Sequence, residues 1–210
     1  MSFLASPSFE NGFPEIPGEP PVVGVLASGS GSKFETIAEC VERGDLDVEL
    51  ETLVCNNPGA GCLQRADRLG VPSQVIDHRQ FDERESFDAA VLEHLKTRGV
   101  EWVVMAGWMR IVTADFIEAY RDRILNLHPS LLPSFPGAHA VADAMEAGVK
   151  VTGCTVHLVT EEVDSGPILA QAAVPVGEDD DRDALHERIH RAEHWLFPRA
   201  IALAVSRRRG

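Results

Sequence analysis

Short apolar runs alternate along the chain with segments whose apolar residues recur every three to four positions. The runs predict buried strands, and the segments predict helices with one buried face. Strands are predicted within 22–32, where a tight turn follows, and at 47–57, 73–77, 101–107, 124–128, 150–160 and 168–176. Helices are predicted at 33–44, 61–70, 81–99, 114–121, near 138–147, and from the acidic segment 177–183 to about residue 205.

Strand and helix alternate through the first 130 residues. This order is typical of an α/β fold with a mostly parallel, twisted sheet flanked by helices. In such sheets ligands bind beyond the carboxyl ends of the strands. Three segments fall at such ends, namely 28–32, 107–110 and 126–128. The pattern therefore predicts a ligand site where these segments meet.

The chain of 210 residues suits a single domain. Residues 1–20 are rich in Pro, Gly and Ser and lack periodicity, so we expect a disordered leader there. The domain is expected to occupy residues 21–205. Residues 206–210, which end in RRRG, are expected to form a solvated tail.

The charge is strongly negative, because 33 acidic residues outnumber 19 basic ones and give a formal net charge of −14. Such a surface repels phosphate backbones and disfavours nucleic-acid binding. The N-terminus lacks the regions of a signal peptide, and no apolar stretch reaches about 18 residues, so no membrane association is predicted. The cysteines, Cys40, Cys55, Cys62 and Cys154, form no C-x-x-C pair. We interpret them as buried side chains of a cytoplasmic protein.

The segment SGSGSK, residues 28–33, follows a strand and opens a helix. A dinucleotide fingerprint would need a third glycine, but Phe34 stands there, and 55–57 provides no acidic partner. A Walker loop is absent as well. The remaining alternatives are a cradle for one phosphate at the helix N-terminus, and a plain turn.

Asn126 and His128 lie two residues apart, so on a strand both side chains point to the same face. Pro129 then stops the strand from continuing. Asp164 lies in a loop between two predicted strands, where an Asp often only forms a turn. Beside His128 it would instead set the tautomer of the imidazole and raise its pKa. The sequence leaves that proximity open.

His186, His190 and His194 recur every four residues and share one helical face. The string HERIH matches the zinc pattern H-E-x-x-H in form. A third ligand would have to come from 195–210, which contains no His, Asp or Glu. A zinc site is therefore the less favoured interpretation.

Four motifs together resemble a known family. NLHPSLLPSFPG (126–137) is similar to the block N-x-H-P-S-L-L-P-x-[FY]-x-G, and GCTVHLVTEEVDSGPILAQAAVPV (153–176) is similar to a second block of the same family. SGSGS (28–32) and AGWMRI (106–111) match its N-terminal loop and its strand-four motif. The chain thus resembles the glycinamide ribonucleotide formyltransferases over about residues 22–200.

This resemblance implies a Rossmann-like fold and a catalytic trio of Asn126, His128 and Asp164. It implies 10-formyltetrahydrofolate as cosubstrate and the amine of glycinamide ribonucleotide as acceptor, with no metal required. The expected partners are small molecules rather than nucleic acid or membrane, and a monomer or homodimer is expected.

The resemblance also assigns binding residues. The ribonucleotide would be held by Gly31, Ser32 and Lys33 at the phosphate, with Glu193 at the ribose and His190 nearby. The folate would be held by Arg84, Met109, Arg110, Ile111, Val112, Asn126, Thr160, Glu161, Glu162, Val163 and Asp164. Trp108 occupies an aromatic position beside this pocket, and His139 and His157 match histidines near the centre.

Two positions depart from the family, since Lys33 replaces a more usual Asn and His190 stands where relatives have Lys or Gln. Formyltetrahydrofolate hydrolase and methionyl-tRNA formyltransferase share the trio. The first carries a regulatory domain before it, and the second has a W-R-G-A loop and a further domain. A nucleotide-binding module without catalysis remains the alternative of a different class.

Overall fold

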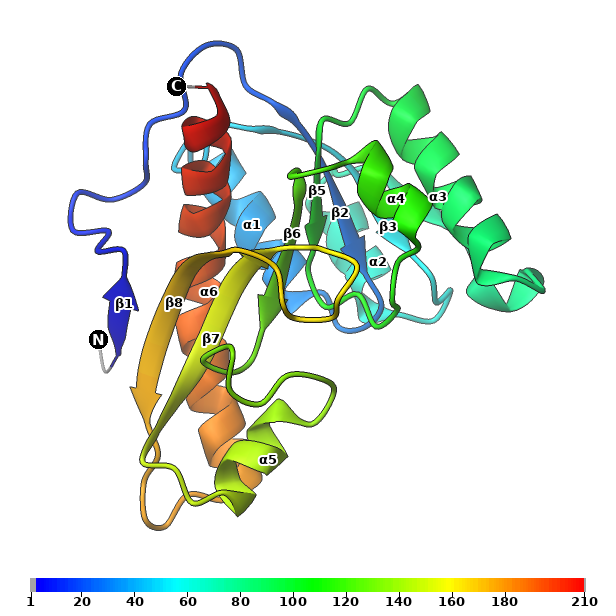
Figure 1. Ribbon diagram of the computed structural model, residues 1–210. Helices are drawn as coiled ribbons and strands as arrows, with labels where there is room; N and C mark the ends of the chain where they lie inside the picture. Colours follow the sequence, from blue (N-terminus) through cyan, green and yellow to red (C-terminus); the bar gives the residue numbers. More distant parts are fainter. Residues whose placement is uncertain (1–2, 210) are drawn as a thin grey trace.

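The computed structural model describes residues 3–209, in which helices cover both faces of an eight-stranded sheet (Figure 1). The strand order is β1-β8-β7-β6-β5-β2-β3-β4. The strands are β1 (Leu4–Ser6), β2 (Val22–Ala27), β3 (Glu49–Cys55), β4 (Ser73–Val75), β5 (Trp102–Met105), β6 (Ile124–His128), β7 (Val151–Leu158) and β8 (Ile168–Pro175). The helices are α1 (Ser32–Glu42), α2 (Gly61–Arg68), the 3₁₀ helix η1 (His78–Gln80), α3 (Arg84–Thr97), α4 (Ala114–Ala119), α5 (Ala140–Glu146) and α6 (Arg182–Arg209). None of the helices described is both long enough and apolar enough to cross a membrane.

The predicted mostly parallel sheet is confirmed. Strands β6, β5, β2, β3 and β4 are parallel neighbours, whereas β6–β7, β7–β8 and β8–β1 are antiparallel pairs. The antiparallel β7–β8 pair has a simple cause. No helix separates these two strands, and a direct return connection pairs consecutive strands antiparallel.

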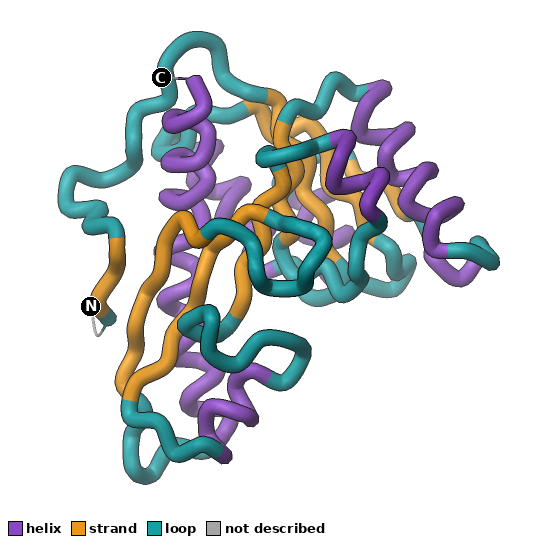
Figure 2. The backbone as a smooth tube through the Cα atoms, viewed as in Figure 1, coloured by secondary structure: helices purple, strands orange, loops and turns teal. Residues whose placement is uncertain are grey.

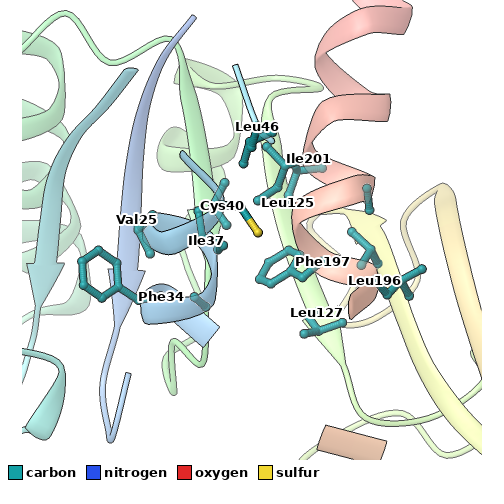
Figure 3. Packing of buried hydrophobic residues seen from close by; sticks show 14 of the residues in the cluster. Val25, Phe34, Ile37, Cys40, Leu46, Leu125, Leu127, Leu196, Phe197 and Ile201 are labelled. Atoms are coloured by element: carbon teal, nitrogen blue, oxygen red, sulfur yellow. The ribbon is translucent and has the colours of Figure 1, made fainter. Parts of the chain in front are cut away.

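Residues alternate between the two faces of the central strands. Val23 and Val25 of β2 pack in one cluster with Phe34 of α1 and Phe197 of α6 (Figure 3). Leu26 belongs to a second cluster, formed with α3 and α4. Successive residues of β2 thus point to opposite faces of the sheet. Because helices cover both faces, the sequence of β2 is almost uninterruptedly apolar.

The loops at the carboxyl ends of β5 and β6 and the loop between β7 and β8 gather on one side of the sheet (Figure 2). The loop after β5 contributes residues 108–112 to a common pocket, the loop after β6 contributes 137–138, and the β7–β8 loop contributes 159–164. Three connections that are distant in sequence therefore build one site, as the predicted sheet requires.

The predicted disordered leader, residues 1–20, is wrong for its described part. Residues Leu4–Ser6 form β1, which pairs with β8 and covers an edge that would otherwise be free. Phe3 and Phe9 contact the ring of Trp195 edge-on, and Ile16 is buried. These apolar residues follow no regular spacing, because they pack on distant parts of the core, Phe3 and Phe9 on Trp195 of α6.

The predicted solvated tail, residues 206–210, is helical where it is described, and Arg207 and Arg208 are exposed to solvent as expected. Helix α6 continues to Arg209, and Gly210 lies outside the described residues. Arg208 donates hydrogen bonds to the carbonyl groups of Arg121 and Asp122. Basic side chains at a helix C-terminus also favour the negative end of the helix dipole, so the basic run prolongs the helix.

Candidate active site

The three residues of the expected trio lie together. Asn126 and His128 are on β6, and Asp164 is in the loop between β7 and β8. Nδ1 of His128 lies 3.2 Å from Oδ2 of Asp164, and both side chains are nearly buried. Asn126 reaches the same carboxylate indirectly, through His157. The proximity that the sequence left open is therefore present.

His128 has a hydrogen-bond acceptor at each ring nitrogen. Nε2 lies 2.8 Å from the carbonyl oxygen of Phe135, and Nδ1 faces the Asp164 carboxylate. A carbonyl oxygen only accepts hydrogen bonds, so Nε2 donates to Phe135. The ring is thus held with Nδ1 within ion-pair distance of the Asp164 carboxylate.

The Asp164 carboxylate is held from several sides. Its Oδ2 accepts a hydrogen bond of 2.8 Å from the Gly137 N–H, and its Oδ1 lies 3.6 Å from Nε2 of His157. Burial raises the pKa of Asp164, but the contacts with His157 and Gly137 and the charge of His128 lower it, so the pKa lies below its ordinary value. The carboxyl is thus ionised at neutral pH. The backbone φ angle of Asp164 is 54°, which is unusual for a residue other than glycine, and such strain clusters at functional sites.

Asn126 is oriented by His157. Nδ1 of His157 lies 2.9 Å from the carbonyl oxygen of Leu158 and donates to it, and Nε2 lies 3.1 Å from Nδ2 of Asn126. The Asn126 amide group carries two N–H donors. One of them remains for a ligand in the pocket that Asn126 lines.

A pocket with a volume of about 320 Å³ lies beside the trio. It is lined mainly by apolar side chains, and the residues expected to bind folate make up most of its wall, with Arg84 as the exception. Those that line it are Met109, Arg110, Ile111, Val112, Asn126, Thr160, Glu161, Glu162, Val163 and Asp164. The sequence missed four further lining residues, Met105, Gly137, Ala138 and Val159.

Helix α3 supports the pocket from outside. Oδ2 of Asp88 accepts a hydrogen bond of 2.6 Å from the N–H of Thr113, next to the lining residue Val112. The Trp108 ring stacks on Phe87 of the same helix. Arg84 begins α3, and its charge acts on the Asp88 carboxyl, although Arg84 does not line the pocket. Sequence reasoning missed Asp88, which carries no motif.

The five residues expected to bind the ribonucleotide lie where α1 meets α6. Nζ of Lys33 lies 2.9 Å from Oε2 of the buried Glu193, and Oγ of Ser32 lies 2.9 Å from Nε2 of His190. Gly31 precedes α1 with a φ of 77°, and no described side chain caps that helix. The first amides of α1 are therefore available to an anion. Burial and the nearby Lys33 charge lower the pKa of His190.

Strand β7 connects the five residues expected to bind the ribonucleotide with the trio. Burial and the negative charge of Glu193 both raise the pKa of the Cys154 thiol. The next residue, Thr155, pairs with His128 across β6 and β7. Both sets of residues thus lie beside Cys154 and Thr155 of β7.

His139 contributes less to the site than the resemblance implies. His139 is exposed at the start of α5 and does not line the pocket. His186 and His194 pack on either side of His190, but no metal-binding group of three or more His, Cys, Asp or Glu exists within residues 3–209.

Comparisons with known proteins agree with this geometry. The profile of the family described as formyl transferase matches residues 22–201. The chain is 41% identical to a phosphoribosylglycinamide formyltransferase of Bacillus subtilis (strain 168), over 84% of this chain and 91% of that protein. It is 44% identical to the crystal structure of glycinamide ribonucleotide transformylase 1 from Symbiobacterium toebii, with a TM-score of 0.89, covering 91% of this chain and 90% of that one.

A longer relative matches as well. The chain is 46% identical to the trifunctional purine biosynthetic protein adenosine-3 of Drosophila melanogaster over 88% of its length, but it spans only 14% of that protein. The family profile, the full-length relative and the solved structure agree, and they show that the chain belongs to the formyl transferase family.

Proposed function

We propose that this protein transfers the formyl group of 10-formyltetrahydrofolate to the amine of N1-(5-phosphoribosyl)glycinamide, in de novo purine (IMP) biosynthesis. The observation that carries the proposal is the His128–Asp164 pair beside Asn126, at the edge of a mainly apolar pocket. The names of the relatives that match over nearly their whole length support the same formyl acceptor. Four free cysteines suit a reducing compartment such as the cytoplasm.

The pocket walls support folate binding. A pterin ring combines a flat apolar face with polar edges, and this pocket combines an apolar lining with a few polar groups. Nε1 of Trp108 and Nε of Arg110 are buried donors without a partner among the described residues. Buried donors normally have an acceptor, and the polar edge of the ring offers several.

Where α1 meets α6, the amides at the start of α1 would hold the phosphate of the ribonucleotide, with Lys33 as a nearby cation. Lys33 is an ammonium with three donors, so it can bind Glu193 and the phosphate together. Oε1 of Glu193 is buried and has no partner among residues 3–209. That free carboxylate oxygen suits a ribose hydroxyl.

The residues of the trio suit the chemistry of formyl transfer. Attack of the amine on the formyl carbon develops negative charge on the formyl oxygen. The free N–H of Asn126 and the imidazolium of His128 can donate to that oxyanion, and donors of this kind supply about 3–4 kcal/mol each. Nε2 of His128 donates to Phe135, so the oxyanion would share or replace that carbonyl. Asp164 keeps His128 charged and, through a water, would help to move the proton from the amine to the leaving folate nitrogen.

An absorbance assay of folate deformylation, run with and without glycinamide ribonucleotide, tests the proposal. We expect turnover only when the amine is present. Turnover with water alone would favour a formyltetrahydrofolate hydrolase. No turnover under either condition would favour a nucleotide-binding module without catalysis.

A further inference from the structure

Two of the four cysteines contact each other. Sγ of Cys62 lies 3.4 Å from Sγ of Cys55, and both side chains are fully buried. Cys55 ends β3 and Cys62 lies in the first turn of α2, so only residues 56–61 separate them. Within residues 3–209 no other pair of thiols is in hydrogen-bond contact.

The two thiols differ in acidity. Cys62 donates a hydrogen bond to Sγ of Cys55, and the N–H of Asn57 lies 3.4 Å from the same sulfur. The Cys62 thiol is the main reason that the pKa of Cys55 falls to about 7, although burial acts against it. The same contact and burial raise the pKa of Cys62. The lowered pKa favours the thiolate of Cys55, which is the nucleophilic form of cysteine.

Cys62 also packs directly against the loop that leads into α1. Its N–H donates a hydrogen bond of 3.1 Å to the carbonyl oxygen of Gly29. A Cβ on Gly31 would lie only 2.4 Å from Cβ of Cys62, so the Gly31 backbone rests on this residue. A displacement of Cys62 must therefore move the segment 29–31.

We propose that Cys55 and Cys62 form a redox modification site, which a hydroperoxide oxidises to a disulfide that shifts the loop at residues 29–33. The further consequence, weaker binding of the ribonucleotide phosphate, rests on the proposed function.

The reaction balances with one hydroperoxide. The Cys55 thiolate attacks one peroxide oxygen and the O–O bond breaks, which leaves a sulfenic acid and, after protonation, one water or alcohol. The Cys62 thiol then loses its proton and attacks the Cys55 sulfur, the S–O bond breaks, and a water leaves. The two thiols lose two electrons and two protons, and a dithiol reductant reverses the process.

A hollow of about 360 Å³ reaches Gly61, the residue before Cys62, and its other lining residues are Ser30, Gln64, Arg65 and Arg68. Neither thiol lines this hollow and both are buried, so the oxidant must be small, such as hydrogen peroxide. An S–S bond of about 2 Å is roughly 1.4 Å shorter than the thiol contact, so closure draws Cys62 toward Cys55.

The full chain, treated with hydrogen peroxide in native buffer at pH 7 and then alkylated and digested, tests the site by peptide mass spectrometry. We expect a Cys55–Cys62 cross-link that dithiothreitol removes, with Cys40 and Cys154 recovered as free thiols. Recovery of Cys55 and Cys62 as free thiols or sulfinic acids would overturn the proposal.

Single substitutions give matched controls. Cys40→Ser and Cys154→Ser should keep the cross-link, because each removes a buried thiol outside the pair. Cys62→Ala should abolish the cross-link and slow the oxidation of Cys55, because the variant removes the hydrogen bond that lowers the pKa of Cys55. Cross-linking at an unchanged rate in either serine variant agrees with the site, and its loss there would contradict it. The wild-type peptide map decides the question even if Cys62→Ala folds poorly.

The effect on the loop has its own readout. Hydrogen exchange of the amides at residues 29–33 should become faster in the oxidised protein, and unchanged exchange would contradict the coupling. The Michaelis constant for the ribonucleotide should rise about tenfold on oxidation, with that for folate within twofold. If the reduced protein shows no turnover, the proposed function fails while the cross-link and the exchange data still decide this inference.

Discussion

Nδ1 of His128 lies 3.2 Å from Oδ2 of Asp164, and this contact joins the end of β6 to the loop between β7 and β8. A carboxylate held this close in a nearly buried site stabilises a positive imidazole. His128 can then act as a charged donor. The contact is the structural basis for the first three predictions.

Asp164→Asn should lower kcat at least about 100-fold, because it removes the negative charge beside His128 and the carboxylate that moves the proton. The pH profile of kcat should also change shape. Steady-state kinetics between pH 5 and 9 measure both effects. Asp179→Asn, an exposed carboxyl before α6, should leave kcat within about twofold and serves as the control. An unchanged profile in Asp164→Asn would contradict the role given to this residue.

The stability of the protein should depend on Asp164 in acid. Burial raises its pKa, but the contacts with His157 and Gly137 lower it below the value in the unfolded chain. The stabilisation is therefore complete above the unfolded pKa of about 4 and is lost as pH falls through the folded pKa. The free-energy difference between wild type and Asp164→Asn in urea unfolding should shrink below pH 4. A difference that stays constant from pH 3 to 7 would show that the lowered pKa has no energetic effect.

His128→Ala should reduce transfer at least about 100-fold, because the oxyanion loses its charged donor. The fold should persist, since β6 is held by backbone hydrogen bonds to both of its neighbours. Circular dichroism checks the fold, and single-turnover kinetics check the transfer. Wild-type rates in a folded variant would rule out His128 as the donor.

Lys33→Met should weaken ribonucleotide binding more than folate binding, with a Michaelis constant raised about tenfold for the first and less than twofold for the second. The variant also leaves the buried Glu193 without its cation, which should cost about 1–3 kcal/mol in unfolding free energy. Lys150→Met, at an exposed lysine, should change neither quantity. Equal increases in both Michaelis constants would refute the phosphate assignment.

The sequence predicted the features that depend on residues close together in the chain. Apolar runs predicted the buried strands, and the spacing of two between Asn126 and His128 placed both on one side of β6. Parallel strands then brought their carboxyl ends together. The pocket wall at Met109 and Val163 came from the family resemblance rather than from periodicity.

The features that the sequence did not predict depend on long-range or backbone contacts. The acceptor at His128 Nε2 is the carbonyl group of Phe135, and a carbonyl group leaves no trace in side-chain pattern. Asp88 supports the pocket through a backbone N–H on a distant loop. In the sequence Phe9 resembles a loop residue, because its partner Trp195 lies on the distant helix α6.

Phe9→Ala should lower the free energy of unfolding by about 1–3 kcal/mol, because it removes an aromatic contact with Trp195 and apolar surface packed on the core. Transfer activity should not change, since Phe9 does not line the pocket. Glu10→Ala, at the exposed neighbouring residue, should be neutral within about 0.5 kcal/mol. Equal stability of both variants in urea unfolding would mean that the segment before β2 is not packed in solution.

Asp88→Ala should damage the folate pocket from outside, because the N–H of Thr113 loses its acceptor in a buried position. The expected cost is about 1–3 kcal/mol in unfolding free energy, together with a higher Michaelis constant for folate. Asp88→Asn keeps an oxygen at this position and removes only the charge, so it should keep the folate Michaelis constant of the wild type.

Asp88→Asn should also differ from the wild type in the pH dependence of its stability. Burial raises the pKa of Asp88, so the folded protein binds this proton more tightly than the unfolded chain. Its favourable contribution is present below the unfolded pKa of about 4 and is lost as pH rises through the folded pKa. Asp88→Asn avoids that loss, and its stability relative to wild type should therefore be higher at pH 7 than at pH 3. If Asp88→Ala and Asp88→Asn raise the folate Michaelis constant equally, the charge rather than the hydrogen bond to Thr113 positions the pocket loop.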